Sequence, residues 1–265
     1  MKYGIDHDLH IHSILSSCSR DPKQSNDAIL RYAEEYGLKQ ICLTNHYWDE
    51  RVFGASSWYE PQNTSHIKSA LPLPKSDKVE FLFGCETEMD RNMTIGISRE
   101  MIEELDFIII PTTHLHMKFV LPEEFEDIPE NKAKLWVRRL DALLSMELPF
   151  NKIGIAHLAC RLINKNSPED YLKTLDLIPE DEMIRLFTKA ASLGCGIELN
   201  KDDMSFEWGG VDTVLRPFKI AKSCGCKFYL GTDSHHPKEF YGMREVYESV
   251  IDSLGLTEDD KFVIR

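Results

Sequence analysis

Metal-ligand residues follow short apolar runs at seven places in the sequence. The residues that end these runs are His10, His12, His46, Glu86, His114, His157, Glu198, Asp233 and His235. Apolar runs of this length are typical of buried parallel strands. The carboxyl ends of parallel strands meet at one rim, and imidazoles and carboxylates gathered there are the ligands of a multi-metal hydrolytic site. The sequence therefore predicts metal-dependent hydrolysis at such a rim.

Strand-like and helix-like segments alternate along the chain and carry these residues. Beyond the first ligand pair, strands are predicted over 40–44, 79–85, 107–112, 153–156, 196–199 and 227–230. Helices are predicted from the cap at Ser25 to Gly37 and over 129–146, 181–193, 211–223 and 244–254. About seven strand–helix units with no linker predict an α/β fold, a closed or nearly closed parallel barrel formed by a single domain over residues 1–265.

Residues 49–77 interrupt this alternation. They contain Gly54, Pro61, Pro72 and Pro74 among many polar residues, which indicates an irregular segment. A long loop at the C-terminal rim of a barrel is often a lid or a wall of the substrate site. We therefore expect this excursion to border the predicted metal site.

The composition limits the partners and surroundings of the protein. Its 265 residues carry a formal net charge of −13, which repels polyanions and disfavours a long nucleic-acid substrate. No apolar run approaches the roughly 20 residues that a bilayer crossing needs, and the N-terminal residues lack the apolar core of a signal peptide. The seven cysteines are scattered and form no evident disulfide framework. We expect a cytoplasmic protein with no membrane segment, a monomer or a small homo-oligomer.

Five motifs occur in order across nearly the whole chain. They are Asp8-Leu9-His10-Ile11-His12-Ser13, Thr44-Asn45-His46, Gly84-Cys85-Glu86, Ala156-His157 and Gly231-Thr232-Asp233-Ser234-His235. Together they resemble the polymerase and histidinol phosphatase (PHP) family of metal-dependent phosphoesterases. The resemblance implies a distorted seven-stranded (β/α) barrel of the TIM type, with two or three divalent ions of zinc, manganese or iron at its C-terminal rim. The chain length is similar to that of the stand-alone histidinol phosphatase branch.

The resemblance also implies how the ligands divide among three metals. The first metal is expected on His10, His12, Glu86 and Asp233, the second on Glu86, His114 and His157, and the third on His46 and His235. Two properties of the residues agree with this division. Alternate residues of an extended segment point the same way, so His10 and His12 can share an ion. A carboxylate has two oxygens, so Glu86 can bridge two ions.

Three positions leave the ligand set open. Cys18 stands where many histidinol phosphatases have a histidine, so a thiolate ligand and a third site completed by water are both consistent with the sequence. His116 competes with His114, and we favour His114 because it lies nearer the strand end. Glu88 competes with Glu86, and we favour Glu86 because it completes the glycine-containing motif.

Further residues are expected to act on the substrate. Arg161 lies four residues after His157 and can hold phosphoryl oxygens bidentately, although a surface arginine at a helix start is the alternative. Asp233 and His235 complete the expected catalytic set, and Glu198 is an expected substrate contact or a support for a ligand. The leading hypothesis is a metal-dependent phosphatase of small phosphomonoesters, with histidinol phosphate as the most specific candidate among phosphorylated metabolites.

Three other functions stay open at this point. A phosphodiesterase or exonuclease acting on nucleotides needs aromatic and basic residues beside the rim; Trp48, Trp58 and Tyr59 supply the aromatics, but lysine and arginine are sparse there. A non-catalytic metal-dependent regulatory module keeps the ligands without turnover. A metal-dependent amidohydrolase also begins with His-x-His, but no lysine clearly follows the relevant strand ends.

Overall fold

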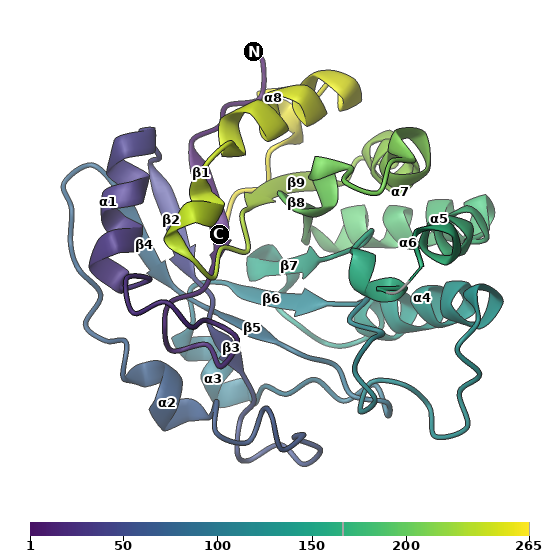
Figure 1. Ribbon diagram of the computed structural model, residues 1–265, viewed down its shortest axis with the longest axis horizontal. Coiled ribbons are helices and arrows are strands. Elements are labelled where there is room, and N and C mark those ends of the chain that lie inside the picture. The colour runs from purple at the N-terminus through teal and green to yellow at the C-terminus, as the bar shows by residue number, and fades with distance from the viewer. Residues whose placement is uncertain (166, 265) are drawn as a thin grey trace.

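The strands of the protein form two parallel sheets with helices around them (Figure 1). The computed structural model describes residues 1–165 and 167–264. One sheet has the order β1-β2-β4, formed by His7–Ile11, Gln40–Leu43 and Glu80–Phe83. The other has the order β3-β5-β6-β7-β8-β9, formed by His46–Tyr47, Cys85–Thr87, Ile108–Pro111, Ile153–Ala156, Gly196–Asn200 and Lys227–Gly231. Every strand pair in these sheets is parallel, as the buried apolar runs predicted.

The helices lie outside the sheets; α1 to α7 lie between strands along the chain, and α8 follows the last strand. They are α1 (Asn26–Tyr36), α2 (Thr64–Lys68), α3 (Arg99–Glu104), α4 (Pro129–Leu144), α5 (Pro168–Asp176), α6 (Glu180–Leu193), α7 (Val211–Ser223) and α8 (Met243–Leu254). Ser25 accepts a hydrogen bond from the amide of Ala28, and Gly37 ends α1 in the left-handed conformation. Among the described residues, no helix combines the length and the apolar character that a membrane crossing requires.

One predicted strand is broken into two segments that belong to different sheets. The stretch predicted over 79–85 forms β4 and the start of β5, with Gly84 between them. The Gly84 amide donates to Leu43 O at 2.9 Å, whereas the Cys85 amide donates to Phe107 O at 3.2 Å, so the chain changes neighbours here. A Cβ on Gly84 would lie 2.3 Å from Phe107 O, which only glycine avoids.

The first and last strands lie side by side, and side chains supply hydrogen bonds between them. The Leu230 amide donates to His7 Nε2 at 3.0 Å, and the Thr232 amide donates to Asp8 Oδ1 at 2.9 Å. At the rim, the Asp233 amide donates to His10 O at 2.7 Å.

The described strands form one sheet of three strands and one of six, and not a single sheet closed into a seven-stranded barrel. The predicted parallel α/β architecture is confirmed, and the predicted strand count and closure are not.

The 49–77 excursion is irregular apart from the short helix α2. Its inner face is nevertheless well packed, because Tyr59 is fully buried and its ring lies 5.9 Å from that of Trp48. The Trp48 indole donates to Val52 O at 2.8 Å, which ties the start of the excursion to β3. The excursion thus forms a fixed wall at the carboxyl ends of the strands.

Candidate metal centre

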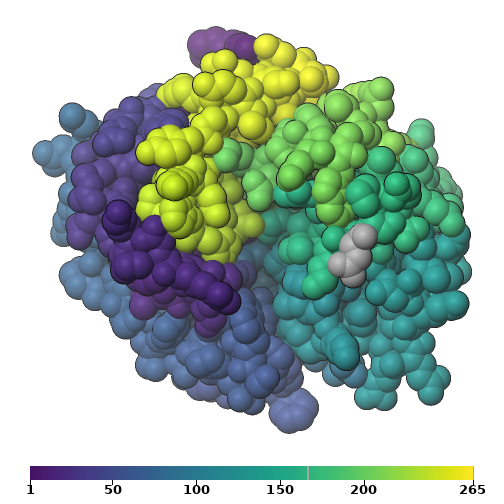
Figure 2. Space-filling view, in the orientation of Figure 1, coloured from purple at the N-terminus to yellow at the C-terminus, as the bar shows by residue number. Residues whose placement is uncertain are grey.

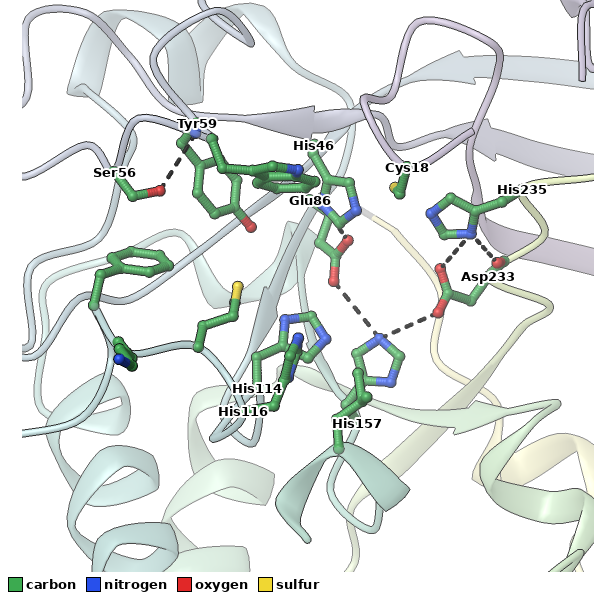
Figure 3. A pocket seen from close by; sticks show the side chains of 15 residues that line it. Cys18, His46, Ser56, Tyr59, Glu86, His114, His116, His157, Asp233 and His235 are labelled. Carbon is green, nitrogen blue, oxygen red and sulfur yellow. Dashed lines mark hydrogen bonds and ion pairs between the residues drawn. The ribbon is translucent and has the colours of Figure 1, made fainter. Parts of the chain in front are cut away.

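The side chains predicted to bind metal lie together at the carboxyl ends of the parallel strands (Figure 3). Strand β1 supplies His10 and is followed by His12, β5 contains Glu86, and His157 directly follows β7. The remaining four come from the start of β3 and from the segments after β6 and β9, and they are His46, His114, Asp233 and His235. The parallel arrangement thus gathers residues from the whole length of the chain at one edge.

The first ligand group consists of His10, His12, Glu86 and Asp233, whose ligand atoms all lie within 4.8 Å of one another. His12 Nε2 lies 3.1 Å from Asp233 Oδ1 and 3.3 Å from Glu86 Oε2. His10 Nε2 lies 3.3 Å from the same Asp233 oxygen. Two ligand atoms at about 2.1 Å from a tetrahedral ion are about 3.4 Å apart. These four side chains are therefore spaced like the ligands of one ion.

Two further groups overlap the first. They are Glu86, His114 and His157, and His12, His46 and His235. Glu86 Oε1 lies 3.6 Å from His157 Nε2, and Glu86 Oε2 lies 2.8 Å from His46 Nδ1. The two carboxylate oxygens thus face different histidines, which is the geometry that a bridging ligand needs. The second group contains His114 and not its rival His116.

Several polar atoms at the centre of these groups are buried and make no hydrogen bond of good geometry, although Glu86 Oε2 and His46 Nδ1 lie 2.8 Å apart. They are both carboxylate oxygens of Glu86, Oδ1 of Asp233 and Nδ1 of His46. Buried polar atoms are normally paired, because an unpaired one loses its hydration without compensation. Divalent ions satisfy such atoms, and mixed imidazole and carboxylate ligation suits zinc, manganese and iron alike. The residues present therefore fit divalent metal ions.

The pKa shifts favour the metal-binding forms at four of the candidate ligands, whereas acidic neighbours of His10, His12 and His157 outweigh their burial and raise the pKa of these imidazoles, whose protons an ion has to displace. Burial opposes the charged forms of Glu86 and Asp233, but neighbouring histidines hold the pKa of both carboxyl groups well below the usual range. Burial lowers the pKa of His46, and burial together with His12 lowers the pKa of His235 to about 3. The two acids are therefore carboxylates and these two imidazoles are neutral, which are the forms that bind metal ions.

Glu198 supports two ligand residues from beneath. Its Oε1 lies 2.5 Å from His10 Nδ1, and its Oε2 accepts from the His157 amide at 3.2 Å. A partner at Nδ1 fixes the ring and leaves Nε2 to face an ion. Because Glu198 is only 1% exposed, these contacts occupy it on the inner side of the ligands. Its predicted contact with substrate stays a prediction.

Glu88 and Arg139 support His114 in the same way; sequence reasoning gave Glu88 only as a rival of Glu86 and missed Arg139. Glu88 Oε2 lies 2.9 Å from His114 Nδ1, and Glu88 Oε1 accepts from Arg139 Nη2 at 2.9 Å. Glu88 and Arg139 are both fully buried. The sequence signal that could have revealed the pair is Arg139 itself, a charged residue on the apolar face of the helix predicted over 129–146. Glu88 therefore lies behind a ligand instead of standing in for Glu86.

Two of the ligand residues have a left-handed backbone. His157 has a φ of 60° and Asp233 a φ of 52°, directly after β7 and soon after β9. Residues other than glycine adopt this conformation at a cost on the order of 1–3 kcal/mol, and such residues concentrate at functional sites. The sharp turns direct both side chains toward the ligand groups (Figure 3).

Arg161 lies in a small hollow beside His157 and Asp233, with a volume of about 260 Å³. Its guanidinium forms an ion pair with Glu207 and lies over the Trp208 ring, 5.6 Å from the ring centroid. A phosphoryl group in this hollow competes with Glu207, which contacts Nη1 of the guanidinium. The predicted contact between Arg161 and substrate stays a prediction.

A larger pocket of about 630 Å³ opens above the ligand groups. Its floor contains His46, Glu86, His114, His157, Asp233 and His235. Its walls contain Cys18, Ser56, Trp58, Tyr59, His116, Met117, Lys118, Phe119 and Leu162. Figure 2 shows this face hollowed between the purple and blue atoms of the N-terminal part and the teal and green atoms of the middle of the chain. Small molecules therefore have direct access to the candidate metal centre, and Ser56, Trp58 and Tyr59 of the 49–77 excursion line the pocket.

The fold and the site together define a parallel α/β protein with a candidate multi-metal centre at the carboxyl ends of its strands. Sequence comparison matches the chain to no protein family and to no curated protein. Among solved structures, the chain is similar to a histidinol phosphate phosphatase from Lactococcus lactis subsp. lactis Il1403, complexed with zinc, L-histidinol and phosphate. The TM-score is 0.56 at 16% identity, over 95% of this chain and 94% of that chain. This similarity shows a shared fold.

Two other structural matches are weaker. A chain in the cryo-EM structure of archaeal ribonuclease P with mature tRNA aligns with a TM-score of 0.38 at 12% identity, over 93% of this chain and 90% of that chain. A probable 2-pyrone-4,6-dicarboxylic acid hydrolase from Acinetobacter baumannii, with citric acid bound, aligns with a TM-score of 0.46 at 11% identity, over 96% and 97%. At these scores neither match bears on the function of this chain.

Proposed function

We propose that the protein is a metal-dependent phosphatase that hydrolyses small phosphomonoesters. The observation that carries this proposal is the overlap of three ligand groups at the floor of an open pocket. Clustered divalent ions are a common means of hydrolysing phosphate esters. The ordered motifs that resemble the PHP family support the same class, and so does the fold shared with a histidinol phosphate phosphatase.

In this proposal the three ligand groups hold two or three ions of zinc, manganese or iron. Bound there, these ions supply the Lewis-acid and water-activating chemistry of a metallohydrolase. Glu86 connects the groups, because its two oxygens face His157 and His46. Glu198 and Glu88 fix the rings of His10 and His114, so that the ligands need little rearrangement when substrate binds.

The phosphate contacts are assigned to residues on two sides of the centre. Asp233 and His235 line the pocket floor and contact the reacting group from the segment after β9. Arg161 reaches the phosphoryl oxygens from the smaller hollow, in competition with Glu207. A guanidinium binds two such oxygens at once and stabilises the charge that they carry during transfer.

Histidinol phosphate is the first substrate to test. The structurally similar protein was crystallised with L-histidinol and phosphate, the two products of its hydrolysis. In this chain the hollow beside Arg161 also contains Asp202 and Asp203, whose carboxyl groups suit the amine of that substrate. The formal charge of −13 disfavours a long nucleic acid as the natural substrate.

The test pairs elemental analysis with an activity screen. Protein purified without chelator is analysed for metal and assayed for phosphate release from histidinol phosphate, other small monoesters and a dinucleotide diester. We expect monoester hydrolysis that a chelator abolishes and added metal restores. Metal-filled protein that releases no phosphate from any monoester would overturn the proposal. Preferential cleavage of the diester would favour the nuclease alternative. A metal-filled protein that hydrolyses no ester but binds a specific protein partner would favour the regulatory module.

A further inference from the structure

The pocket above the ligand groups has two aromatic and apolar walls that metal binding does not explain. Trp58 and Tyr59, from the 49–77 excursion, form one wall, and Met117 and Phe119, from the segment after β6, form the other. The walls pack against each other, since the Tyr59 ring lies 5.6 Å from that of Phe119 and 4.7 Å from that of Trp58. Their shape is therefore set before any ligand binds.

Two polar atoms in these walls are buried without a hydrogen-bond partner. They are the hydroxyl oxygen of Tyr59 and Nδ1 of His116. Figure 3 shows the Tyr59 phenol pointing from its wall toward Glu86. Buried hydroxyls normally find a partner, and a phenol is protonated at neutral pH because its ordinary pKa is about 10. Tyr59 therefore has a hydrogen bond to offer a bound molecule.

The walls carry little charge for a substrate to meet. Among the described residues, Lys118 is the only lysine or arginine that lines this pocket. The lining carboxylates are Glu86 and Asp233, and both belong to ligand groups. An ammonium group in this pocket finds no free carboxylate and lies close to the bound cations. Coulomb repulsion therefore disfavours a cationic group here.

We propose that this pocket binds an uncharged aromatic leaving group of the phosphate ester. The inference rests on the proposed phosphatase function and favours a class of alcohol other than histidinol, whose ammonium group this pocket disfavours. The ring lies against the two walls where they meet, and a neutral polar substituent bonds to Tyr59 or His116. Apolar walls with a few placed polar atoms are typical of sites for such groups. In the reaction, water provides the oxygen that bonds to phosphorus, the ester P–O bond breaks, and the leaving oxygen takes a proton from that water.

The first test compares esters that share one kind of leaving oxygen. 2-Phenylethyl phosphate, n-propyl phosphate and 2-aminoethyl phosphate all release a primary alcohol, so their kcat/KM values report pocket contacts. Burial of a phenyl ring predicts a preference of roughly tenfold to a hundredfold for the phenylethyl ester over the propyl ester. The aminoethyl ester is expected to be the poorest of the three. A binding titration of the metal-filled protein with 2-phenylethylphosphonate and propylphosphonate measures the same preference without turnover.

The second test changes the walls. Trp58→Ala should lower kcat/KM for the phenylethyl ester by roughly tenfold more than for the propyl ester, because the Trp58 ring also lies 5.0 Å from that of His46 and its loss acts on both esters. Phe53→Ala is the matched control, because Phe53 lies on the same excursion but is 96% exposed and outside the pocket. A ring hydroxyl, as in 2-(4-hydroxyphenyl)ethyl phosphate, should improve kcat/KM by roughly 2- to 12-fold, and Tyr59→Phe should remove part of that gain.

The outcomes separate the two proposals. Equal kcat/KM for the phenylethyl and propyl esters, or an equal effect of Trp58→Ala on both, overturns the leaving-group inference and leaves the phosphatase proposal intact. No hydrolysis of any ester overturns the phosphatase proposal. If 2-phenylethylphosphonate then still binds more tightly than propylphosphonate, and Trp58→Ala removes that difference, the aromatic subsite is supported without the proposed reaction. Equal binding of the two phosphonates overturns it.

Discussion

Replacing Glu88 by glutamine tests whether the buried chain of Arg139, Glu88 and His114 holds a metal ligand in place. The carboxylate accepts from His114 Nδ1 and from Arg139 Nη2, each at 2.9 Å. Glutamine keeps the size of the side chain but has one acceptor oxygen and a donor amide. It therefore cannot accept from both neighbours through separate oxygens. His114 then loses the partner that directs its Nε2 toward the ligand group.

The expected magnitude follows from these contacts. Loss of the partner behind a ligating histidine lowers metal affinity by about 10- to 100-fold, so we expect Glu88→Gln to weaken one bound ion by that factor. Glu88→Ala also leaves the Arg139 guanidinium buried without a counter-charge, which costs about 3–5 kcal/mol. Arg139 keeps its hydrogen bonds to Thr112 O and Met89 O, both at 2.9 Å. We therefore expect Glu88→Ala to lower the free energy of unfolding by about 3 kcal/mol, near the lower end of that range.

Two measurements separate affinity from stability. Metal content after dialysis against graded chelator gives the affinity, and urea unfolding of the metal-free protein gives the free energy of unfolding. Glu182→Gln is the matched control, because Glu182 pairs with Arg185 at 2.7 Å on the exposed surface, where such pairs contribute about 0–1 kcal/mol. Wild-type metal affinity in Glu88→Gln would refute the proposed support of His114. An unchanged free energy of unfolding in Glu88→Ala would refute the buried ion pair.

Three further changes test other parts of the structure. Glu86→Ala should lose more metal than His46→Ala in elemental analysis, because Glu86 faces two groups; equal or smaller loss contradicts the bridging role. Arg161→Ala should lower kcat/KM for phosphate esters by about one to two decades with metal content unchanged, since charge-assisted bonds contribute about 1.5–3 kcal/mol; wild-type kinetics would leave Arg161 as a surface residue. The hydrogen bond with His7 holds the pKa of Asp6 well below its usual range, so its stabilisation is present above about pH 4 and is lost as the pH falls further. The difference in unfolding free energy between wild type and Asp6→Asn should therefore stay constant from about pH 6 to pH 4 and shrink between about pH 4 and pH 2; a pH-independent difference argues against this interaction.

Local signals predicted much of the fold. Strand β7 and helix α7 begin and end at the predicted residues, 153–156 and 211–223. Ser25 and Gly37 cap α1 as expected, because side-chain capping and left-handed glycine depend on neighbouring residues alone. Helix α5 was not predicted, although Pro168 at its first turn after a serine is a usual start signal.

The features that sequence reasoning missed depend on contacts between distant residues. The break at Gly84 arises because its backbone meets the carbonyl of Phe107, which lies on another segment. Glu88 and Arg139 are 51 positions apart, and neither residue identifies the other as its partner. The convergence of the ligands was predictable, because parallel strands place their carboxyl ends at one edge. The supports behind the ligands were not, because their roles exist only after the helices pack.

The third ligand group differs from the one that the resemblance implied. Cys18 lines the pocket but belongs to none of the groups among the described residues, whereas His12 joins His46 and His235. Although Cys18 is an exposed residue, partial withdrawal of its thiol from water, together with the nearby carboxylates of Asp233 and Glu86, raises the pKa of the thiol to about 12, which favours the thiol over a thiolate ligand. His12 also belongs to the first group, and its Nδ1 already bonds to the Ser16 hydroxyl, which leaves only Nε2 to bind an ion. One Nε2 atom cannot ligate two ions, so the two groups compete for it. An ion in the first group leaves the third with two imidazoles, and we therefore expect a third ion to be the one that dissociates most readily.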